Sequence, residues 1–352
     1  MNQLKRVTSW LKENLFSSTL NSLVSVFLII FSTWFLTFIF KWIFIDGVWQ
    51  GTAETCRESQ GACLVFIKEK YLFILFGFYP RELLWRPSIG MALFFLMLWW
   101  SKNPKRWNKR LLVRWAKLSL LLALLMRGGI LGFKYVSPDQ WGGLPLTLLL
   151  SFLGVVFSYP LGIFLALGRT GRLPLVKGLC VGYIELIRGV PMISLLFMAS
   201  VMFPIFLPEG LTLPKIMRAQ IAIIMFMSAY MAEVVRGGLS AVSQGQYEAA
   251  SALGLGYWMS MRKVILPQAL KIVIPPSVNT IIGMFKDTSL VVIIALSDLL
   301  MTTKTSLKDS NWLGFSLEAY IFTGLIYFSL CSFMSRYSKR LEKEFSYRKV
   351  TT

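Results

Sequence analysis

The chain of 352 residues contains no histidine, only four cysteines and only 17 acidic residues. The absence of histidine removes the commonest general base, metal ligand and proton relay, so we expect neither a metal site nor a catalytic residue. There is also no glycine-rich phosphate-binding loop of the Walker type and no acidic magnesium partner for one. The chain is therefore not expected to hydrolyse ATP by itself. A membrane-embedded enzyme is disfavoured because converging nucleophiles, acids or metal ligands are missing.

Hydrophobic residues are abundant: they make up 55% of the chain, aromatic residues 14%, and the mean hydropathy is +0.62. This composition indicates that the bilayer is the solvent. The net charge is +20, and the basic residues gather in short segments between apolar runs. They are Lys102, Lys105, Arg106, Lys109 and Arg110, then Arg169, Arg172 and Lys177, then Lys339, Arg340 and Lys343. That pattern is typical of cytoplasmic loops. No aromatic-interleaved basic groove is present, so nucleic acid is not expected as a partner.

Apolar stretches of about 20 residues, the length that crosses a bilayer, predict an all-α polytopic membrane protein with about eight transmembrane helices. The predicted spans are residues 21–45, 83–100, 111–133, 143–168, 183–207, 218–235, 272–293 and 315–335. With the N-terminus inside, the loops 101–110, 169–177 and 241–271 and the C-terminus all fall inside. Three of these four segments are strongly basic, so topology and charge agree.

Some spans carry unusual residues. Arg127 lies within the third predicted span and requires an interfacial position or a partner in the protein. Pro160, Pro191, Pro275 and Pro276 lie in or beside apolar spans, where they predict either simple kinks or broken helices near a pathway.

Two cysteines, Cys56 and Cys63, share a polar loop at residues 46–87 that we expect outside. They could close a disulfide if the loop faces an oxidising compartment, but the spacing alone does not decide this. Cys180 and Cys331 lie in or beside apolar runs and are interpreted as small hydrophobic residues.

The inside loop at 241–271 contains the most informative sequence. Glu248, Ala249 and Ala250 are strong helix formers, and Gly254 permits a tight turn. A second short amphipathic helix follows to about Lys263, and Pro267 then redirects the chain. We expect two short helices at an angle, projecting from the membrane as a rigid lever that a groove of another protein could move.

This spacing resembles the EAA signature of permease subunits of ABC importers: Glu-Ala-Ala, three residues, Gly254, nine residues, then Val264-Ile-Leu-Pro267. The family usually has isoleucine where this chain has Val264. Further stretches resemble the polar-amino-acid branch of that family: Glu185–Pro191, Tyr230–Gly238, and Asn279 with Lys286–Leu290. Together they cover about residues 143–335. The N-terminal extension resembles the larger permease of broad-specificity L-amino-acid importers.

The resemblance implies three parts: an N-terminal extension at 1–142 with three membrane helices and an external loop, a five-helix permease core at 143–335, and a cytoplasmic basic tail at 336–352. It also implies a multi-pass protein of the bacterial inner membrane with both termini cytoplasmic. Its implied partners are a second permease, two ATPase subunits, a periplasmic amino-acid-binding protein, the transported amino acid and membrane lipid. The chain itself would bind no cofactor, since ATP and Mg²⁺ would be used by the ATPases.

The residues implied in coupling to the ATPases are Gly245, Glu248, Ala249, Ala250, Gly254 and Pro267. An ion-coupled secondary amino-acid transporter is the alternative class. It would share the hydropathy, but it would have no use for a lever-like inside loop.

A substrate pathway is predicted around Lys286 and Asp287, because an amino-acid zwitterion needs opposite charges or helix ends to replace its water. Thr288 and Ser289 follow directly, and Asn279 lies two helical turns earlier on about the same face. The alternative is that Lys286 and Asp287 mark the outer end of the seventh span. Two further pairs at i, i+3 spacing, Glu185 with Arg188 and Glu233 with Arg236, are interpreted as structural ion pairs near the inner interface.

Overall fold

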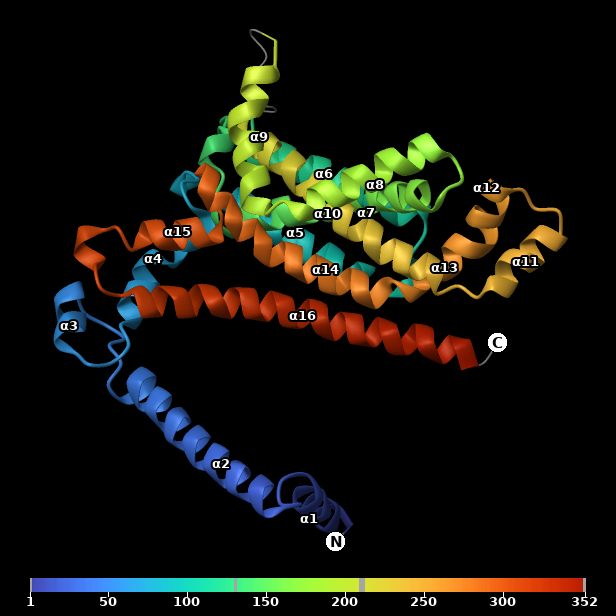
Figure 1. The fold of residues 1–352 in the computed structure, drawn as a ribbon. Helices are drawn as coiled ribbons and strands as arrows, with labels where there is room; N and C mark the ends of the chain where they lie inside the picture. The colour runs from blue at the N-terminus through green and yellow to red at the C-terminus, as the bar shows by residue number, and fades with distance from the viewer. Residues whose placement is uncertain (1, 130–131, 209–212, 351–352) are drawn as a thin grey trace. The chain divides into compact units, whose positions relative to one another are not determined.

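The computed structural model describes residues 2–129, 132–208 and 213–350. The chain divides into two compact units. The first comprises residues up to Glu69 together with Asp309–Ala319, and the second comprises Lys70–Lys308 together with the chain from Tyr320 onward. Figure 1 shows the elements of each unit with their labels.

The first unit begins with two helices, α1 (Asn2–Asn14) and α2 (Thr19–Phe40), and α2 continues as a π-helical turn at Lys41–Ile45. Ser18 caps α2, because its hydroxyl oxygen accepts a hydrogen bond from the Asn21 N–H. No residue of α2 is buried, and its apolar side chains point outward on every side. A helix that is apolar all round needs lipid or protein around it, which agrees with the first predicted span.

A short polar segment follows α2. It contains α3 (Ala53–Glu58) and the start of α4 (Leu64–Phe76). The first unit also includes a 3₁₀ turn at Ser310–Trp312, from the later part of the chain. Phe66 lies against the rings of Trp312 and Phe315, with ring centroids 5.9 and 6.1 Å away. These aromatic contacts form the small core of the first unit.

The second unit contains two helices of the N-terminal extension, α5 (Trp85–Ser101) and α6 (Lys109–Arg127). Arg86 is 2% exposed and lies over the rings of Trp85 and Phe133, while its guanidinium donates to the Lys134 carbonyl oxygen at 2.8 Å. The turn after α6 requires Gly128, because φ is +65° and an added Cβ would overlap the Lys134 carbonyl oxygen. These contacts fix how α6 ends.

The centre of the second unit is the pair α7 (Gly143–Thr170) and α10 (Lys215–Ser240). The helices approach closely at Gly162, where an added Cβ would lie 2.8 Å from the Met231 Cβ and 3.1 Å from the Ala232 N. Small residues allow such approach between membrane helices. Between them in the sequence lie α8 (Pro174–Gly189) and α9 (Met192–Phe206).

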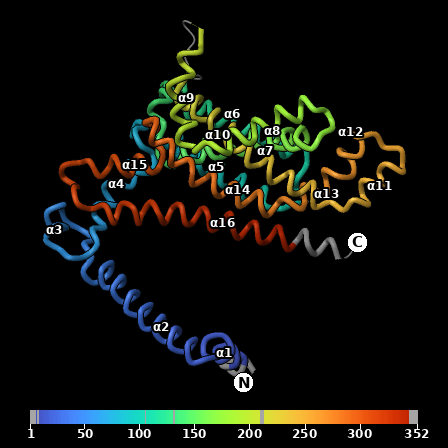
Figure 2. Tube along the Cα trace, in the orientation of Figure 1, coloured from blue at the N-terminus to red at the C-terminus, as the bar shows by residue number. Residues whose placement is uncertain are grey.

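After α10 the chain forms α11 (Gln244–Ala252), α12 (Tyr257–Ser260), a π-helical turn at Met261–Ile265 and α13 (Leu266–Ile272). It continues as α14 (Ile274–Asp287), a 3₁₀ segment at Thr288–Ile294, α15 (Leu299–Ser306) and α16 (Ser316–Val350). In the tube of Figure 2, α16 runs alongside α14. Phe285 of α14 contacts Tyr327 of α16, with ring centroids 5.4 Å apart.

The predicted all-α membrane class is confirmed, since the described parts of the chain contain helices and no strand. Six of the described helices are long and apolar enough to span a membrane, and α8 with α9 gives a seventh if the two form one span. The third predicted span corresponds to α6, which carries five basic residues. It is not among the described helices that are long and apolar enough to span a membrane.

The fifth predicted span, 183–207, is a broken pair of helices, which is one of the two outcomes that Pro191 predicted. The chain bends by 104° between α8 and α9. Val190 and Pro191 are both extended at the bend, because the residue before a proline disfavours helical backbone and proline lacks the N–H that would continue the helix.

Candidate coupling element and substrate pathway

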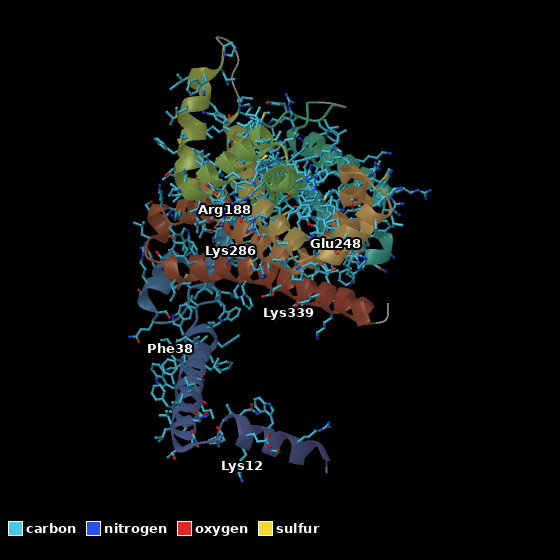
Figure 3. All side chains as sticks on the ribbon, turned by 45° about the vertical axis from the view of Figure 1, so that its right-hand side comes forward. Lys12, Phe38, Arg188, Glu248, Lys286 and Lys339 are labelled. Carbon is cyan, nitrogen blue, oxygen red and sulfur yellow. A yellow bond between two sulfur atoms is a disulfide. The ribbon has the colours of Figure 1, made fainter. Side chains whose placement is uncertain are left out.

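The predicted lever at 241–271 forms α11 and α12, which lie together at one end of the second unit, beyond α10 and α13 (Figure 1). Glu248 and Ala249 are exposed on α11, whereas Ala250 is 2% exposed. Glu248 is labelled in Figure 3. Gly245 lies in the first turn of α11, and Pro267 lies in the first turn of α13, directly after the π-helical turn.

The turn between α11 and α12 depends on Gly254, which has a φ of +71°. The Gly254 N–H donates to the Ser251 carbonyl oxygen at 2.9 Å, and the Leu255 N–H donates to the Ala250 carbonyl oxygen at 3.1 Å. A left-handed residue that closes a helix in this way is most often glycine. The turn therefore sets the direction in which α12 leaves α11.

Several contacts fasten α11 and α12, which we call the coupling element, to the helices α10 and α13. The Tyr247 hydroxyl donates to the Leu239 carbonyl oxygen of α10 at 3.1 Å, and the Gln268 side-chain amide of α13 donates to the Gln246 side-chain oxygen at 2.9 Å. Val242 and Ile265 belong to an apolar cluster with residues of α7, α8, α10 and α13. These contacts tie α11 to α10 and α13.

The outer surface of the coupling element is apolar and uncovered in the isolated chain. Leu253 is 78% exposed and Trp258 is 72% exposed, and Tyr257 and Met259 lie beside them. An exposed cluster of large apolar side chains typically marks a protein or membrane interface.

The predicted pathway residues lie where α14 changes from α-helix to 3₁₀-helix. Lys286 is exposed, Asp287 is half-buried and ends α14, and Thr288 is buried at the start of the 3₁₀ segment. The hydroxyls of Thr288 and Ser289 donate to the backbone carbonyl oxygens of Phe285 and Lys286, at 2.8 and 2.7 Å. These two hydroxyls therefore already have acceptors within the helix. The 3₁₀ segment follows the end of α14 and stops at Ala295, whose backbone is left-handed, so it closes the helix rather than interrupting it.

Asn279 and Lys286 are both exposed and lie seven residues apart on α14, which places them on one face. Lys286 lies near the middle of the candidate span Ile274–Ile294. Both interpretations of Lys286 and Asp287, as pathway residues and as the outer end of the span, stay predictions. Figure 3 labels Lys286 on this helix.

Cys56 and Cys63 form a disulfide in the first unit, with Cα atoms 5.4 Å apart. The Cys63 N–H donates to the Glu318 carboxylate at 3.0 Å. Arg57 donates to the Asn311 carbonyl oxygen at 3.1 Å, so the loop is also held to the segment before α16.

Comparison with known proteins identifies the family of the chain. Residues 158–347 match the family described as the binding-protein-dependent transport system inner membrane component. The chain is 45% identical over 345 residues to the inner membrane amino-acid ABC transporter permease protein YhdY of Escherichia coli K12, covering 97% of this chain and 94% of the relative. The chain belongs to this family of transport permeases.

A second relative is the glutamate/glutamine/aspartate/asparagine transport system permease protein BztC of Rhodobacter capsulatus. It is 37% identical over 403 residues, which cover 95% of this permease and 93% of the relative. A solved structure, described as an amino acid ABC transporter with histidines, is 33% identical, has a TM-score of 0.52 and covers 57% of the permease and 92% of that chain. The predicted resemblance to ABC-importer permeases is confirmed, and the ion-coupled alternative is disfavoured.

Sequence reasoning missed a larger ion-pair cluster in this permease, centred on Glu233 of α10. The Glu233 carboxylate contacts Arg169 of α7 at 3.1 Å, Arg188 of α8 at 3.6 Å and Arg236 at 3.1 Å. The predicted Glu233–Arg236 pair is therefore present, but Glu185 pairs with Arg169 at 3.5 Å. The cluster joins three helices, and no spacing within a single helix could have indicated a contact between α7 and α10.

Sequence reasoning also missed Asp298, which precedes α15 and is fully buried. Its carboxylate caps α15 by accepting from the Met301 and Leu300 N–H groups at 2.9 and 3.1 Å. Burial raises the pKa of Asp298 to about 6, although the two backbone hydrogen bonds oppose this shift. A signal was available in the sequence, because aspartate directly before a helical stretch is a typical N-cap.

Proposed function

We propose that this chain is the permease subunit of an ATP-driven amino-acid importer. The observation that carries the proposal is the coupling element: α11 and α12 expose an apolar surface and are fastened to the membrane helices α10 and α13. Both relatives described above are named as amino-acid transport permeases, which supports the same substrate class. The importer would also contain a second permease, a paralogue of this one, two cytoplasmic ATPases and a periplasmic amino-acid-binding protein.

ATP hydrolysis would take place in the ATPase subunits. Closure of the ATPase pair would move a groove that holds the exposed side of α11 and α12, with Glu248 and Trp258 on the contact surface. Tyr247 and the apolar cluster around Val242 and Ile265 would carry this motion to α10 and α13. The membrane helices would then switch between outward-facing and inward-facing states, which is alternating access through a two-state element.

The amino acid would pass the exposed face of α14. Lys286 supplies a cation for the substrate carboxylate, Asp287 supplies an anion for its ammonium group, and Asn279 supplies an amide on the same face.

The proposed topology has both termini in the cytoplasm. The basic segments at 101–110 and 169–177 and the coupling element would then face the ATPases, and the Cys56–Cys63 loop would face the periplasm. Disulfides persist in that oxidising compartment, which supports the orientation.

Transport by reconstituted complexes tests the proposal. The permease would be purified with its partners, placed in proteoliposomes and supplied with ATP and the binding protein. Asp287→Asn keeps the shape of the side chain but removes the anion, so we expect amino-acid import to fall and binding-protein-stimulated ATPase activity to change. Asp139→Asn is the matched control, because it removes an exposed carboxylate outside every candidate span. Equal import of acidic, neutral and basic amino acids by wild type and Asp287→Asn would refute the pathway assignment.

A further inference from the structure

A groove of about 700 Å³ lies between α5, α6, α7, α14 and α16 in the second unit. Its walls are aromatic and aliphatic, and they include Phe94, Phe152, Phe285 and Leu330. This volume falls within the ~300–1,000 Å³ of typical ligand pockets. A zwitterionic amino acid would find almost no polar partner along such walls, so the groove is unsuited to the transported substrate.

Polar groups gather at one end of the groove. Lys102 and Asn108 line this end, and the Tyr337 hydroxyl of α16 donates to the Lys102 carbonyl oxygen at 3.2 Å. The Trp107 indole N–H donates to the Ser101 carbonyl oxygen at 2.9 Å. Tryptophan and tyrosine are enriched where a membrane protein meets the lipid headgroups. The groove therefore has one polar end, of the kind found at lipid headgroups, and mainly apolar walls elsewhere.

Lys102 lines the polar end, and further basic residues lie close to it in the sequence. The Lys102 ammonium lies 3.4 Å from the Trp99 ring centroid, while Arg106 and Arg114 lie over the Trp100 ring at 4.9 and 4.5 Å. Between residues 102 and 117, which connect α5 to the start of α6, the sequence has seven basic residues and no acidic residue. Aromatic rings thus hold several cations in place without neutralising their charge.

We propose that the groove binds a phospholipid with an anionic headgroup, such as phosphatidylglycerol. The acyl chains would lie along Phe94, Phe285 and Leu330, and the headgroup phosphate would contact the Lys102 ammonium. Basic pockets between membrane helices bind anionic headgroups by this combination of charge and apolar depth. The lipid would fill the space between the extension helices α5 and α6 and the core helices α14 and α16.

Charge complementarity favours a lipid over helix α2 of the chain itself. α2 is apolar enough to enter such a groove, but the segment before it, α1, carries three basic residues and one acidic residue. A cationic segment next to the cationic end would be repelled, whereas a phosphate would be attracted.

Native mass spectrometry of the purified importer complex tests the proposal. The complex would be titrated with phosphatidylglycerol and with phosphatidylcholine of the same acyl chains. We expect saturable binding, with phosphatidylglycerol preferred by about fivefold or more, since each basic residue near a headgroup contributes a factor of that order. Lys102→Gln should abolish the preference for phosphatidylglycerol and leave the affinity for phosphatidylcholine unchanged.

Matched variants separate a site from general surface attraction. Lys109→Gln removes an equal charge from the same basic segment, at an exposed position that does not line the groove. This variant should keep the preference for phosphatidylglycerol. Leu330→Trp on α16 and Leu98→Trp on α5 should each reduce binding of both lipids by filling the groove, while the complex still elutes at its normal size.

Four results would overturn the proposal. Three of them are equal affinity for the two lipids in the wild type, equal losses in Lys102→Gln and Lys109→Gln, and undiminished lipid binding in both tryptophan variants. Absence of saturable lipid binding would also overturn it. A crosslink between a cysteine placed at Leu330 and one placed in α2 would then assign the groove to α2.

Discussion

Replacing Gly254 with valine should uncouple ATP hydrolysis from transport without removing the protein from the membrane. Gly254 has a φ of +71°, and an added Cβ would meet no atom within 4 Å. The substitution therefore changes only the backbone preference. A β-branched residue held in this left-handed region costs about 1–3 kcal/mol, which is comparable to the two turn hydrogen bonds at ~0.5–1.5 kcal/mol each. The turn should open, and α12 should lose its fixed direction relative to α11.

The assay compares import with ATP consumption in proteoliposomes that contain the complete importer. A cost of about 1.4 kcal/mol shifts the turn equilibrium tenfold, so we expect the import rate of Gly254→Val to fall by about that factor or more. Gly256→Ala is the matched control. Gly256 has a φ of −63° and open space around it, so alanine should be tolerated there. Gly254→Asn should retain intermediate transport, because asparagine tolerates the left-handed region. Normal import by Gly254→Val, or equal losses in Gly254→Val and Gly256→Ala, would refute the reasoning.

Three further predictions concern the packing of α10, the external loop and Asp298. Gly238→Ala should destabilise the detergent-solubilised protein by about 1–3 kcal/mol and so lower its melting temperature. The added Cβ would overlap Val273 and lie 2.9 Å from the Ala269 carbonyl oxygen. Gly237→Ala is the control, because its Cβ enters open space and the melting temperature should not change. In intact cells, a membrane-impermeant thiol reagent should label Cys56 or Cys63 only after reduction; labelling without reduction, or protection of both until lysis, would contradict an external disulfide. For Asp298, the raised pKa means that the folded state binds more protons than the unfolded state between the ordinary value of 3.8 and about 6. Stability of the wild type should therefore fall as pH rises through that window, by up to about 3 kcal/mol. Asp298→Asn should lack this fall, and identical pH profiles of melting temperature would count against the assignment.

The sequence by itself determined the membrane class, most of the spans and the coupling loop. Hydropathy is a local property, and a stretch such as 143–168 can enter a bilayer as a helix whatever it later contacts. The turn at Gly254 could be predicted for the same reason, because the conformational freedom of glycine needs no distant partner. The spacing from Glu248 to Pro267 was specific enough to indicate the family.

Only the tertiary structure decided which distant groups meet. Pro191 in the stretch 183–207 predicted either a kink or a broken helix, and only the structure shows the 104° bend between α8 and α9. Arg169 was visible as one cation of an inside loop, and only the packing of α7 against α10 brings it to Glu233. The groove beside Lys102 exists because five helices from two parts of the sequence leave it unfilled. Such contacts depend on the packing of helices that lie far apart in the chain, and periodicity within one helix carries no information about them.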